Sequence, residues 1–234
     1  MNGVKFGDKH SYFDFDLILT NKEIQYPDPK TEKVDVMGMD GELDLTNVLG
    51  DTVKFHNRKL SFTFTLIKNS QKEFANSLTE IANYLHGNKF RIVIDSDSEY
   101  YYVGRCTINK FKTDKRTSTI QIDVDAEPYK YEVIPENKRW LWNPFSFENG
   151  VIPNTEISIT GSKELHLKNL KKVVIPKITC SVPMTLTIDG KTYNLKSGEN
   201  LIHEIKLHEG DNLVTVTVES GTGTIKFEYV CGAL

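Results

Sequence analysis

The nearest match to a metal-binding motif lies at residues 203–208, which read His-Glu-Ile-Lys-Leu-His. Zinc proteases place two histidines four residues apart on one face of a helix, with a glutamate after the first. Here the spacing is five, and apolar residues alternate with polar ones, which predicts a strand. Residues five apart in a strand point to opposite faces, so His203 and His208 are not expected to share a metal ion.

Two groups of carboxylates could bind calcium or transfer protons. Residues 95–99 (Asp-Ser-Asp-Ser-Glu) resemble the start of a calcium loop, but Tyr100 replaces its glycine and Cys106 its final glutamate. A polar turn between two strands explains these acids better. Asp14 and Asp16 share one side of a strand-like stretch, where paired carboxylates could do acid–base work. We expect them to face solvent instead.

Aromatic clusters are candidate stacking platforms for a sugar. Three successive tyrosines begin at Tyr100, but successive residues in a strand face opposite ways and cannot form one platform. Trp140 and Trp142 are expected to hold two domains together. There is no Gly-x-Ser-x-Gly, Walker or dinucleotide motif, and no catalytic cysteine or serine constellation. The sequence therefore predicts a protein that is not an enzyme, with no catalytic residues, no metal site and no cofactor.

The expected elements of the first half are antiparallel strands and one helix. Residues 59–66 and 119–125 alternate strictly between apolar and polar side chains, as half-buried strands do. Between them, residues 70–73 form a capping box, and Gly87 supplies a helix end. The apolar stripe of this helix comprises Phe74, Leu78, Ile81 and Leu85. A helix packed on a sheet is therefore predicted.

The second half is expected to contain only strands. Prolines and tryptophans interrupt any periodic pattern at residues 133–152, which predicts a linker. Asp189-Gly190 predicts a tight hairpin, and turns are also expected at residues 210–212 and 221–223. Strands are expected at residues 156–160, 164–170, 173–180, 184–188, 192–195, 201–207, 213–218 and 224–230. The predicted fold class is mainly β, with an α+β domain at 1–132 and a β-sandwich or jelly roll at 153–234.

Composition is that of an ordinary globular protein made in a reducing cytoplasm. The 234 residues carry a net charge of −3, which argues against a general nucleic-acid or membrane binder. The densest basic cluster, Lys168 to Lys177, lacks interleaved aromatics and is expected to be a solvated face. No apolar run has the length of a signal peptide or a membrane span. Cys106, Cys180 and Cys231 predict buried thiols, although Cys180 and Cys231 could meet.

A polar segment at residues 27–46 stands out from the rest. Pro27 and Pro29 impose extended geometry on their neighbours. A Gly-x-Asp-Gly turn at residues 38–41 is followed by strand-like alternation at residues 42–45. A long polar segment of this kind is uncommon in a compact domain and usually has a task at a surface.

Several motifs in order resemble the distal tail protein (Dit) family of long-tailed, siphovirus-type bacteriophages. The segment at residues 27–46 matches the family's N-terminal domain, except that Met39 stands where the family often has arginine. The other matching motifs are Phe6-Gly7, Asp14 to Leu17, Phe55 to Phe62, Leu85 to Gly87, Tyr100 to Arg105 and Pro128 to Tyr131.

This resemblance implies a structural hub of the phage tail tip, or baseplate, and hence a virion protein. The N-terminal domain would be a tail-tube-like β-sandwich with one helix, six copies of which close into a homohexameric ring. The C-terminal domain would be galectin-like and would hold adhesion components. Expected partners are the tail tube protein, a tail-tip protein and a receptor-binding or tail-fibre protein, with no specific nucleic-acid or membrane binding. A carbohydrate-binding, lectin-like module is the first alternative, and an enzyme that acts on the cell wall, suggested only by scattered carboxylates, is the second.

The ring contact is expected to use the segment at residues 27–46, added to a neighbour's sheet edge. Arg58 and Arg105 are candidates to pair with aspartates of that segment. The ring-interface candidates are Pro27, Pro29, Asp35, Asp40, Gly41, Asp44, Arg58 and Arg105. A weakly acidic ring would also suit a conduit through which DNA passes without sticking.

Overall fold

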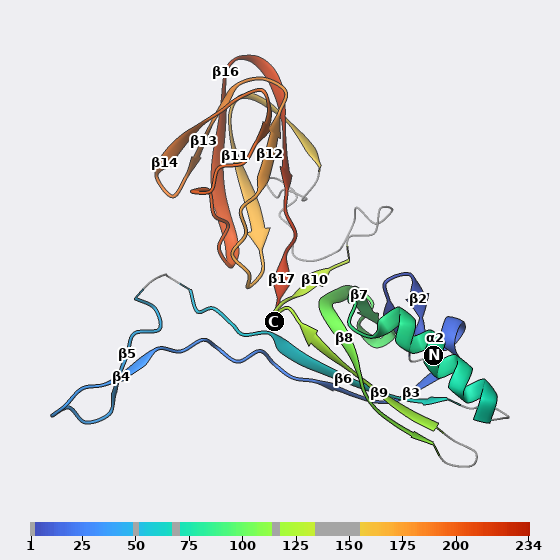
Figure 1. The fold of residues 1–234 in the computed structure, drawn as a ribbon. Helices are drawn as coiled ribbons and strands as arrows, with labels where there is room; N and C mark the ends of the chain where they lie inside the picture. The colour runs from blue at the N-terminus through green and yellow to red at the C-terminus, as the bar shows by residue number, and fades with distance from the viewer. Residues whose placement is uncertain (1–2, 49–51, 67–70, 114–117, 134–154) are drawn as a thin grey trace. The chain divides into compact units, whose positions relative to one another are not determined.

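The computed structural model describes residues 3–48, 52–66, 71–113, 118–133 and 155–234. These residues form two compact units, Met1–Lys130 with Leu234 and Tyr131–Ala233. The mainly β fold class is confirmed (Figure 1). The division at residues 132 and 153 stays a prediction, because the expected linker lies almost entirely outside the described residues.

Unit 1 is built on one curled antiparallel sheet, with helix α2 (Gln71–Leu85) packed against it (Figure 1). The strand order is β2-β1-β7-β8-β9-β6-β3, and a 3-10 turn at Asp95–Asp97 joins β7 to β8. The strands are β1 Val4–Phe6, β2 Lys9–His10, β3 Leu17–Ile24, β6 Arg58–Leu66, β7 Lys89–Ile94, β8 Tyr100–Thr113 and β9 Ser118–Ala126. One sheet that curls thus takes the place of two separate layers.

The core of unit 1 forms where the predicted apolar faces meet. Leu60, Phe62 and Phe64 of β6 are completely buried and alternate with half-buried polar side chains. Ile81 and Leu85 of α2 join the same cluster. Each such side chain contributes about 1.5–3 kcal/mol when fully buried, which exceeds any gain from helix propensity. The predicted strands and helix stripe are confirmed, while the capping serine at position 70 lies outside the described residues.

The strand expected around Asp14 and Asp16 is wrong. Residues Ser11–Phe15 form a short helix, α1, capped by His10, whose Nδ1 accepts hydrogen bonds from the N–H groups of Tyr12 and Phe13 at 3.1 and 3.5 Å. Asp16 ends α1 in the left-handed conformation with φ of 55°. The two carboxylates therefore do not line one side of a strand.

Unit 2 is an antiparallel sheet in which two long strands carry most of the pairing. β16 pairs along its length with β11, and its other edge pairs first with β13 and then with β12. The strands are β11 Glu156–Asn169, β12 Lys177–Cys180, β13 Met184–Ile188, β14 Lys191–Leu195, β15 Gly198–Asn200 and β16 Gly210–Glu228. β10 (Lys130–Glu132) pairs with β17 (Gly232–Ala233) outside this six-stranded sheet.

Several expected strand limits in unit 2 need correction. The runs at 156–160 and 164–170 join into β11, and those at 213–218 and 224–230 join into β16. Gly161 and Gly221, with φ of +67° and +78°, lie at the bend where the register between β11 and β16 shifts. Residues 221–223, where a turn was expected, therefore lie inside β16 rather than between two separate strands.

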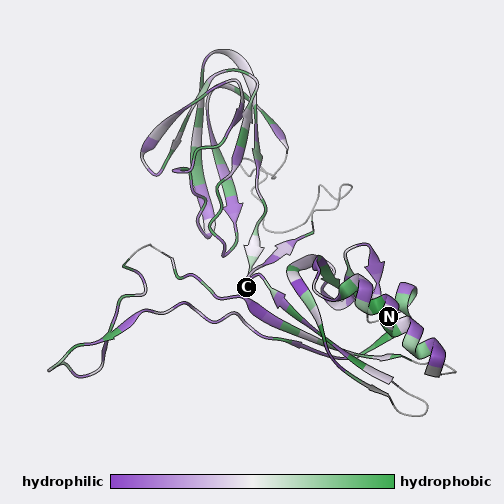
Figure 2. Ribbon diagram, in the orientation of Figure 1, coloured by the Kyte–Doolittle hydropathy of each residue, from purple (hydrophilic) through white to green (hydrophobic). Residues whose placement is uncertain are grey.

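The strand expected at residues 201–207 is also wrong. Residues 202–205 turn, with the Ile205 N–H bonded to the Ile202 carbonyl at 3.1 Å, and only Leu207 forms a β-bridge. The hairpin at Asp189-Gly190 is confirmed, because Ile188 pairs with Lys191 and both turn residues have positive φ. Figure 2 shows the apolar positions concentrated on the strands of both units. No helix in the described ranges is both long and apolar enough to cross a membrane.

Candidate functional site

The most exposed feature of unit 1 is a projecting hairpin, which we call the arm and define as residues 26–48. At its base, Pro29 forms a β-bridge with Phe55, and the Lys30 N–H donates to the Lys54 carbonyl at 2.8 Å. Beyond the base, β4 (Lys33–Asp35) pairs only with β5 (Glu42–Asp44). A two-stranded hairpin is marginally stable by itself, so the arm lacks the support that the main sheet has.

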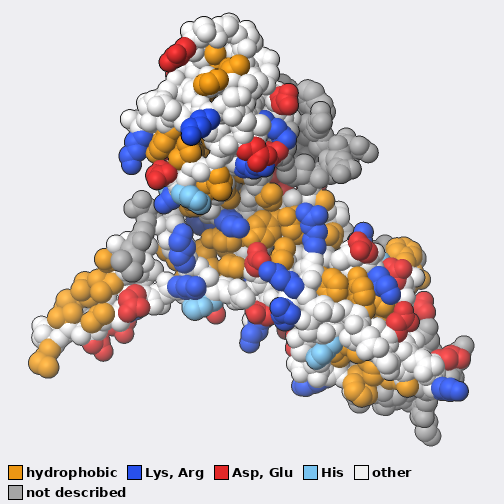
Figure 3. Space-filling view, turned by 45° about the horizontal axis from the view of Figure 1, so that its top comes forward, with side chains coloured by type: hydrophobic (Ala, Val, Ile, Leu, Met, Phe, Trp, Pro, Cys, Tyr) orange, Lys and Arg blue, Asp and Glu red, His pale blue; other side chains and the backbone are white. Residues whose placement is uncertain are grey.

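The arm has one apolar face and one charged face. Val34 lies opposite Leu43, and Val36 follows on the same face at the next alternate position. Lys33, Asp35 and their cross-strand partners Asp44 and Glu42 lie on the other face. Figure 3 shows the two kinds of side chain separated along the arm. Half-buried antiparallel strands have this pattern when one face is covered.

In the arm, however, the apolar face is uncovered. Val34, Val36 and Leu43 are each more than 40% exposed. At the tip, Met37 is fully exposed and Met39 is 47% exposed. Clusters of exposed apolar side chains mark interaction sites, and methionine adapts to irregular partners.

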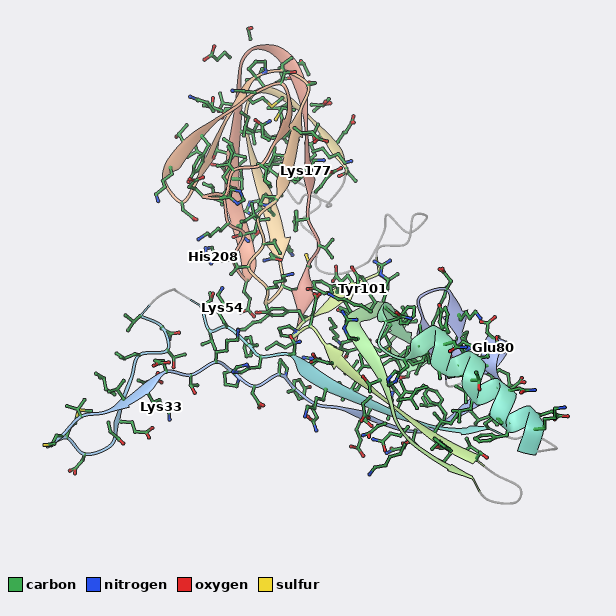
Figure 4. The ribbon with its side chains drawn as sticks, in the orientation of Figure 1. Lys33, Lys54, Glu80, Tyr101, Lys177 and His208 are labelled. Carbon is green, nitrogen blue, oxygen red and sulfur yellow. The ribbon has the colours of Figure 1, made fainter. Side chains whose placement is uncertain are left out.

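The charges of the arm are predominantly acidic. Six acids, Asp28, Glu32, Asp35, Asp40, Glu42 and Asp44, accompany two lysines, Lys30 and Lys33. Lys33 pairs with Glu42 at 3.4 Å across the hairpin (Figure 4). Hydrogen bonds from the Thr46 side chain and backbone hold the pKa of Asp44 below its usual value. Among the described residues, Asp35 and Asp40 have no such partner.

Of the remaining ring-interface candidates, three lie in the arm and two on the sheet. Pro27 is buried and fixes the base of the arm, whereas Pro29 is exposed. Gly41 has φ of +81° and shapes the tip. Arg105 in β8 is exposed and donates a hydrogen bond to the Gly87 carbonyl beyond the end of α2.

Arg58, the first residue of β6, is 2% exposed. Its Cζ lies 5.5 Å from the ring centre of Tyr102 and 5.8 Å from that of Tyr26. Burial lowers its pKa, opposed by the two tyrosines. Neither Arg58 nor Arg105 contacts an arm aspartate within one chain, so pairing with the arm would have to occur between copies. The role of all eight candidates stays a prediction.

The other sequence candidates do not assemble into a site. Asp95 accepts a hydrogen bond from the Gly3 N–H at 2.8 Å, and Asp97 pairs with Lys130 at 3.0 Å. These acids thus belong to the polar turn that was predicted. The described residues contain no group of three or more His, Cys, Asp or Glu placed to hold a metal ion.

Each of the three successive tyrosines faces a different cation. Tyr101 stacks with Arg91 at 3.7 Å, Tyr100 with Lys130 at 4.2 Å, and Tyr102 with Arg58. The prediction that they do not form one platform is confirmed. Trp140 and Trp142 lie outside the described residues.

Two features escaped sequence reasoning. The burial of Arg58 depends on Tyr26 and Tyr102, which are distant in the chain, so no local pattern signals it. An open cleft of about 630 Å³ in unit 2 surrounds the Asp189-Gly190 turn and includes His208 and Asn212. The turn was predicted, but its approach to residues 208–213 follows from the pairing of β13 with β16.

Comparison with known proteins gives a match in structure. No protein-family model and no curated protein sequence matches the chain. The crystal structure of the SPP1 Dit (gp 19.1) protein, described as a paradigm of the hub adsorption apparatus in phages that infect Gram-positive bacteria, does match. The two share 13% sequence identity with a TM-score of 0.63, over 97% of this chain and 98% of that one. The chain therefore has the fold of the SPP1 protein, as the motifs predicted.

Proposed function

We propose that the chain is a structural hub of a phage tail tip, a member of the distal tail protein family that closes into a ring of six copies. The fold shared with the SPP1 hub protein across nearly both whole chains carries this proposal. The ordered motifs in the N-terminal half support it independently. In this role the chain is a virion protein without enzymatic activity, made in the cytoplasm of the bacterial host.

The arm supplies the contact between neighbouring copies. Its apolar face, Val34 with Val36 and Leu43, is uncovered within one chain, and burying it on a second copy removes this surface from water. A ring needs two different patches per subunit, because each copy contacts one neighbour with the arm and the other with the receiving surface. The tail tube would bind one side of the ring. A galectin-like unit 2 would hold tail-tip and receptor-binding or tail-fibre proteins.

Deletion of residues 26–46 tests this assignment. The intact chain is expected to give a native mass near six times 26.7 kDa, roughly 160 kDa, by light scattering across a range of concentrations. The deleted chain is expected to remain folded and monomeric. Rings formed by the deleted chain would show that the arm is not the contact.

A milder variant tests the contribution of the apolar face without removing the arm. Val34→Thr/Val36→Thr/Leu43→Thr keeps residues suited to strands but removes apolar area, and it should weaken association at least tenfold. The matched control, Lys33→Thr/Glu42→Thr, changes the opposite face and removes both partners of the ion pair. It is expected to leave association nearly unchanged, because exposed ion pairs contribute little.

The alternative function, saccharide binding, has one observation in its favour. The cleft of about 630 Å³ in unit 2 is lined by polar groups, among them Asp189, His208 and Asn212. Yet none of the described residues that line it is Phe, Tyr or Trp, the side chains that stack best on a sugar ring. Saturable binding in a screen of host cell-wall glycans, lost in Asn212→Ala, would favour this function over the hub.

A further inference from the structure

Arg58 is buried with only part of its guanidinium hydrogen-bonded. It is 2% exposed and bonds to the Tyr102 side chain, but its Nε and Nη2 have no hydrogen-bond partner among the described residues. No ion pair to a carboxylate compensates its charge within the described part of the chain. A buried charge without a partner destabilises a fold, because its lost hydration is not replaced. An arginine in this state is suited to receive an anion from another molecule.

The two unpartnered atoms form the binding edge of the guanidinium. Nε and Nη2 lie on one side of the planar group, where two parallel N–H donors match the two oxygens of a carboxylate. Tyr102, on one side, is 3% exposed and fixed in β8, whereas Tyr26 is 79% exposed at the start of the arm. Of the two rings beside Arg58, Tyr26 is therefore the one that a second molecule can contact.

We propose that this edge of Arg58 binds the Asp40 carboxylate of a second copy of the chain. The inference rests on the proposed ring and names the contact that anchors the arm in it. Glu42 is already paired with Lys33, and Asp44 is held by Thr46. Asp35 and Asp40 remain, and only Asp40 lies at the tip, where a hairpin can reach a buried group.

The residues around Asp40 fit the surroundings of Arg58. Met37 and Met39 precede it at the tip and are exposed. Thioether side chains pack well against aromatic rings, and Tyr26 provides an exposed ring at Arg58. Contact between them would exclude water from the ion pair and strengthen it. The acidic arm and the unpaired cation thus complement each other in both charge and polarity.

A double-mutant cycle in the full chain tests the pair. Arg58→Met and Asp40→Asn are each expected to raise at least tenfold the concentration at which half the chains are in rings, measured by light scattering. The double variant should associate no more weakly than the more weakly associating of the two single variants, because both changes remove the same contact. Arg58→Lys should restore association only in part, since lysine cannot form the fork. Asp189→Asn and Lys191→Met, at exposed positions of the unit 2 hairpin, serve as charge-matched controls and should assemble normally.

The stability of the monomer provides a second measurement, in which Arg58→Met is not expected to be harmful. In the Asp40→Asn background at low concentration, adding Arg58→Met should leave the urea midpoint unchanged or raise it, because it removes an unpaired buried charge. A lowered midpoint with intact ring formation would assign Arg58 a structural role and overturn the proposal.

The remaining outcomes separate this proposal from that of the ring. Rings that persist in Arg58→Met but vanish on arm deletion would leave the ring proposal standing and overturn the Arg58 contact. If Asp35→Asn rather than Asp40→Asn couples to Arg58, the assignment of Asp40 is wrong. An intact chain that stays monomeric at every concentration would instead contradict the ring itself.

Discussion

At the scale of single residues, the three cysteines illustrate how burial controls chemistry. All three thiols are buried and free. Burial raises the pKa of Cys106 to about 12, and the pKa values of Cys180 and Cys231 to about 11, the last with a contribution from nearby Glu132. Because the thiolate is the reactive form, these residues are protonated and inert at neutral pH.

We expect stability to fall at alkaline pH through these thiols. Their folded-state pKa values lie above the unfolded value of 9.0, so each contributes its full stability below pH 9. The contribution is lost as the pH rises through 11–12, at up to about 1.4 kcal/mol per pH unit for each thiol. Urea unfolding between pH 7 and 10.5 measures this slope.

Cys106→Ala is the control for this pH dependence. It should lower stability at pH 7, because a small cavity remains, and flatten the alkaline decline. An unchanged slope in this variant would assign the decline to other groups, such as Tyr229, whose pKa burial also raises. The raised pKa of each thiol cannot be predicted from the sequence, because the neighbours that bury it are distant in the chain.

At the scale of elements, two glycines are required for different reasons, one for steric space and the other for its backbone conformation. Gly104 lies in β8 where an added Cβ would fall 2.8 Å from the Ala126 Cα and 2.5 Å from the Val124 side chain. Gly41 at the arm tip has open space around it but φ of +81°. The two positions therefore predict different kinds of defect.

Gly104→Ala is expected to lower the unfolding free energy of unit 1 by about 2–3 kcal/mol, because the backbone of β9 must move. Gly41→Ala should cost only about 1 kcal/mol, confined to the arm, and should weaken association. Urea midpoints and light scattering on both variants measure these effects. A large loss of unit 1 stability in Gly41→Ala would mean that the arm contributes to the core.

Helices and strands could be predicted from the sequence where a periodic apolar pattern corresponds to one face packed on the core. The alternation of β6 predicted its buried face, because successive side chains of a strand point to opposite faces and only one face packs on the core. The same pattern at residues 201–207 gave a wrong prediction. Ile205 and Leu207 are buried there, but they belong to a segment that turns and not to a strand. Helix α1 was missed because its cap, His10, and the hydrogen bond from the Val4 N–H to Ser11 are not periodic signals.

At the scale of the whole molecule, two separate cores imply two folding units. The apolar cluster of unit 1 and that of unit 2 share no residue. A fragment of residues 131–234 is expected to unfold cooperatively by circular dichroism, with the midpoint of the corresponding transition in the full chain. A fragment without a cooperative transition would contradict this expectation.

A shorter fragment, residues 155–234, is the matched comparison. It lacks Tyr131, whose hydroxyl accepts a hydrogen bond from Lys172 at 2.9 Å, and it lacks the partner of β17. We expect it to fold with a lower midpoint, by about 1–2 kcal/mol in unfolding free energy. Equal midpoints would show that the β10–β17 pair adds no stability.

The pairing of β11 with β16 also determines how unit 2 responds to mechanical load. Glu156, near the start of β11, lies opposite Lys226, near the end of β16. A pulling force applied at these two points acts across the ladder and separates its hydrogen bonds one pair after another, as a zipper opens. Shearing would require all of them to break together. Tension would therefore open the unit from this end at low force, while the bend at Gly161 and Gly221 would mark the point where opening pauses.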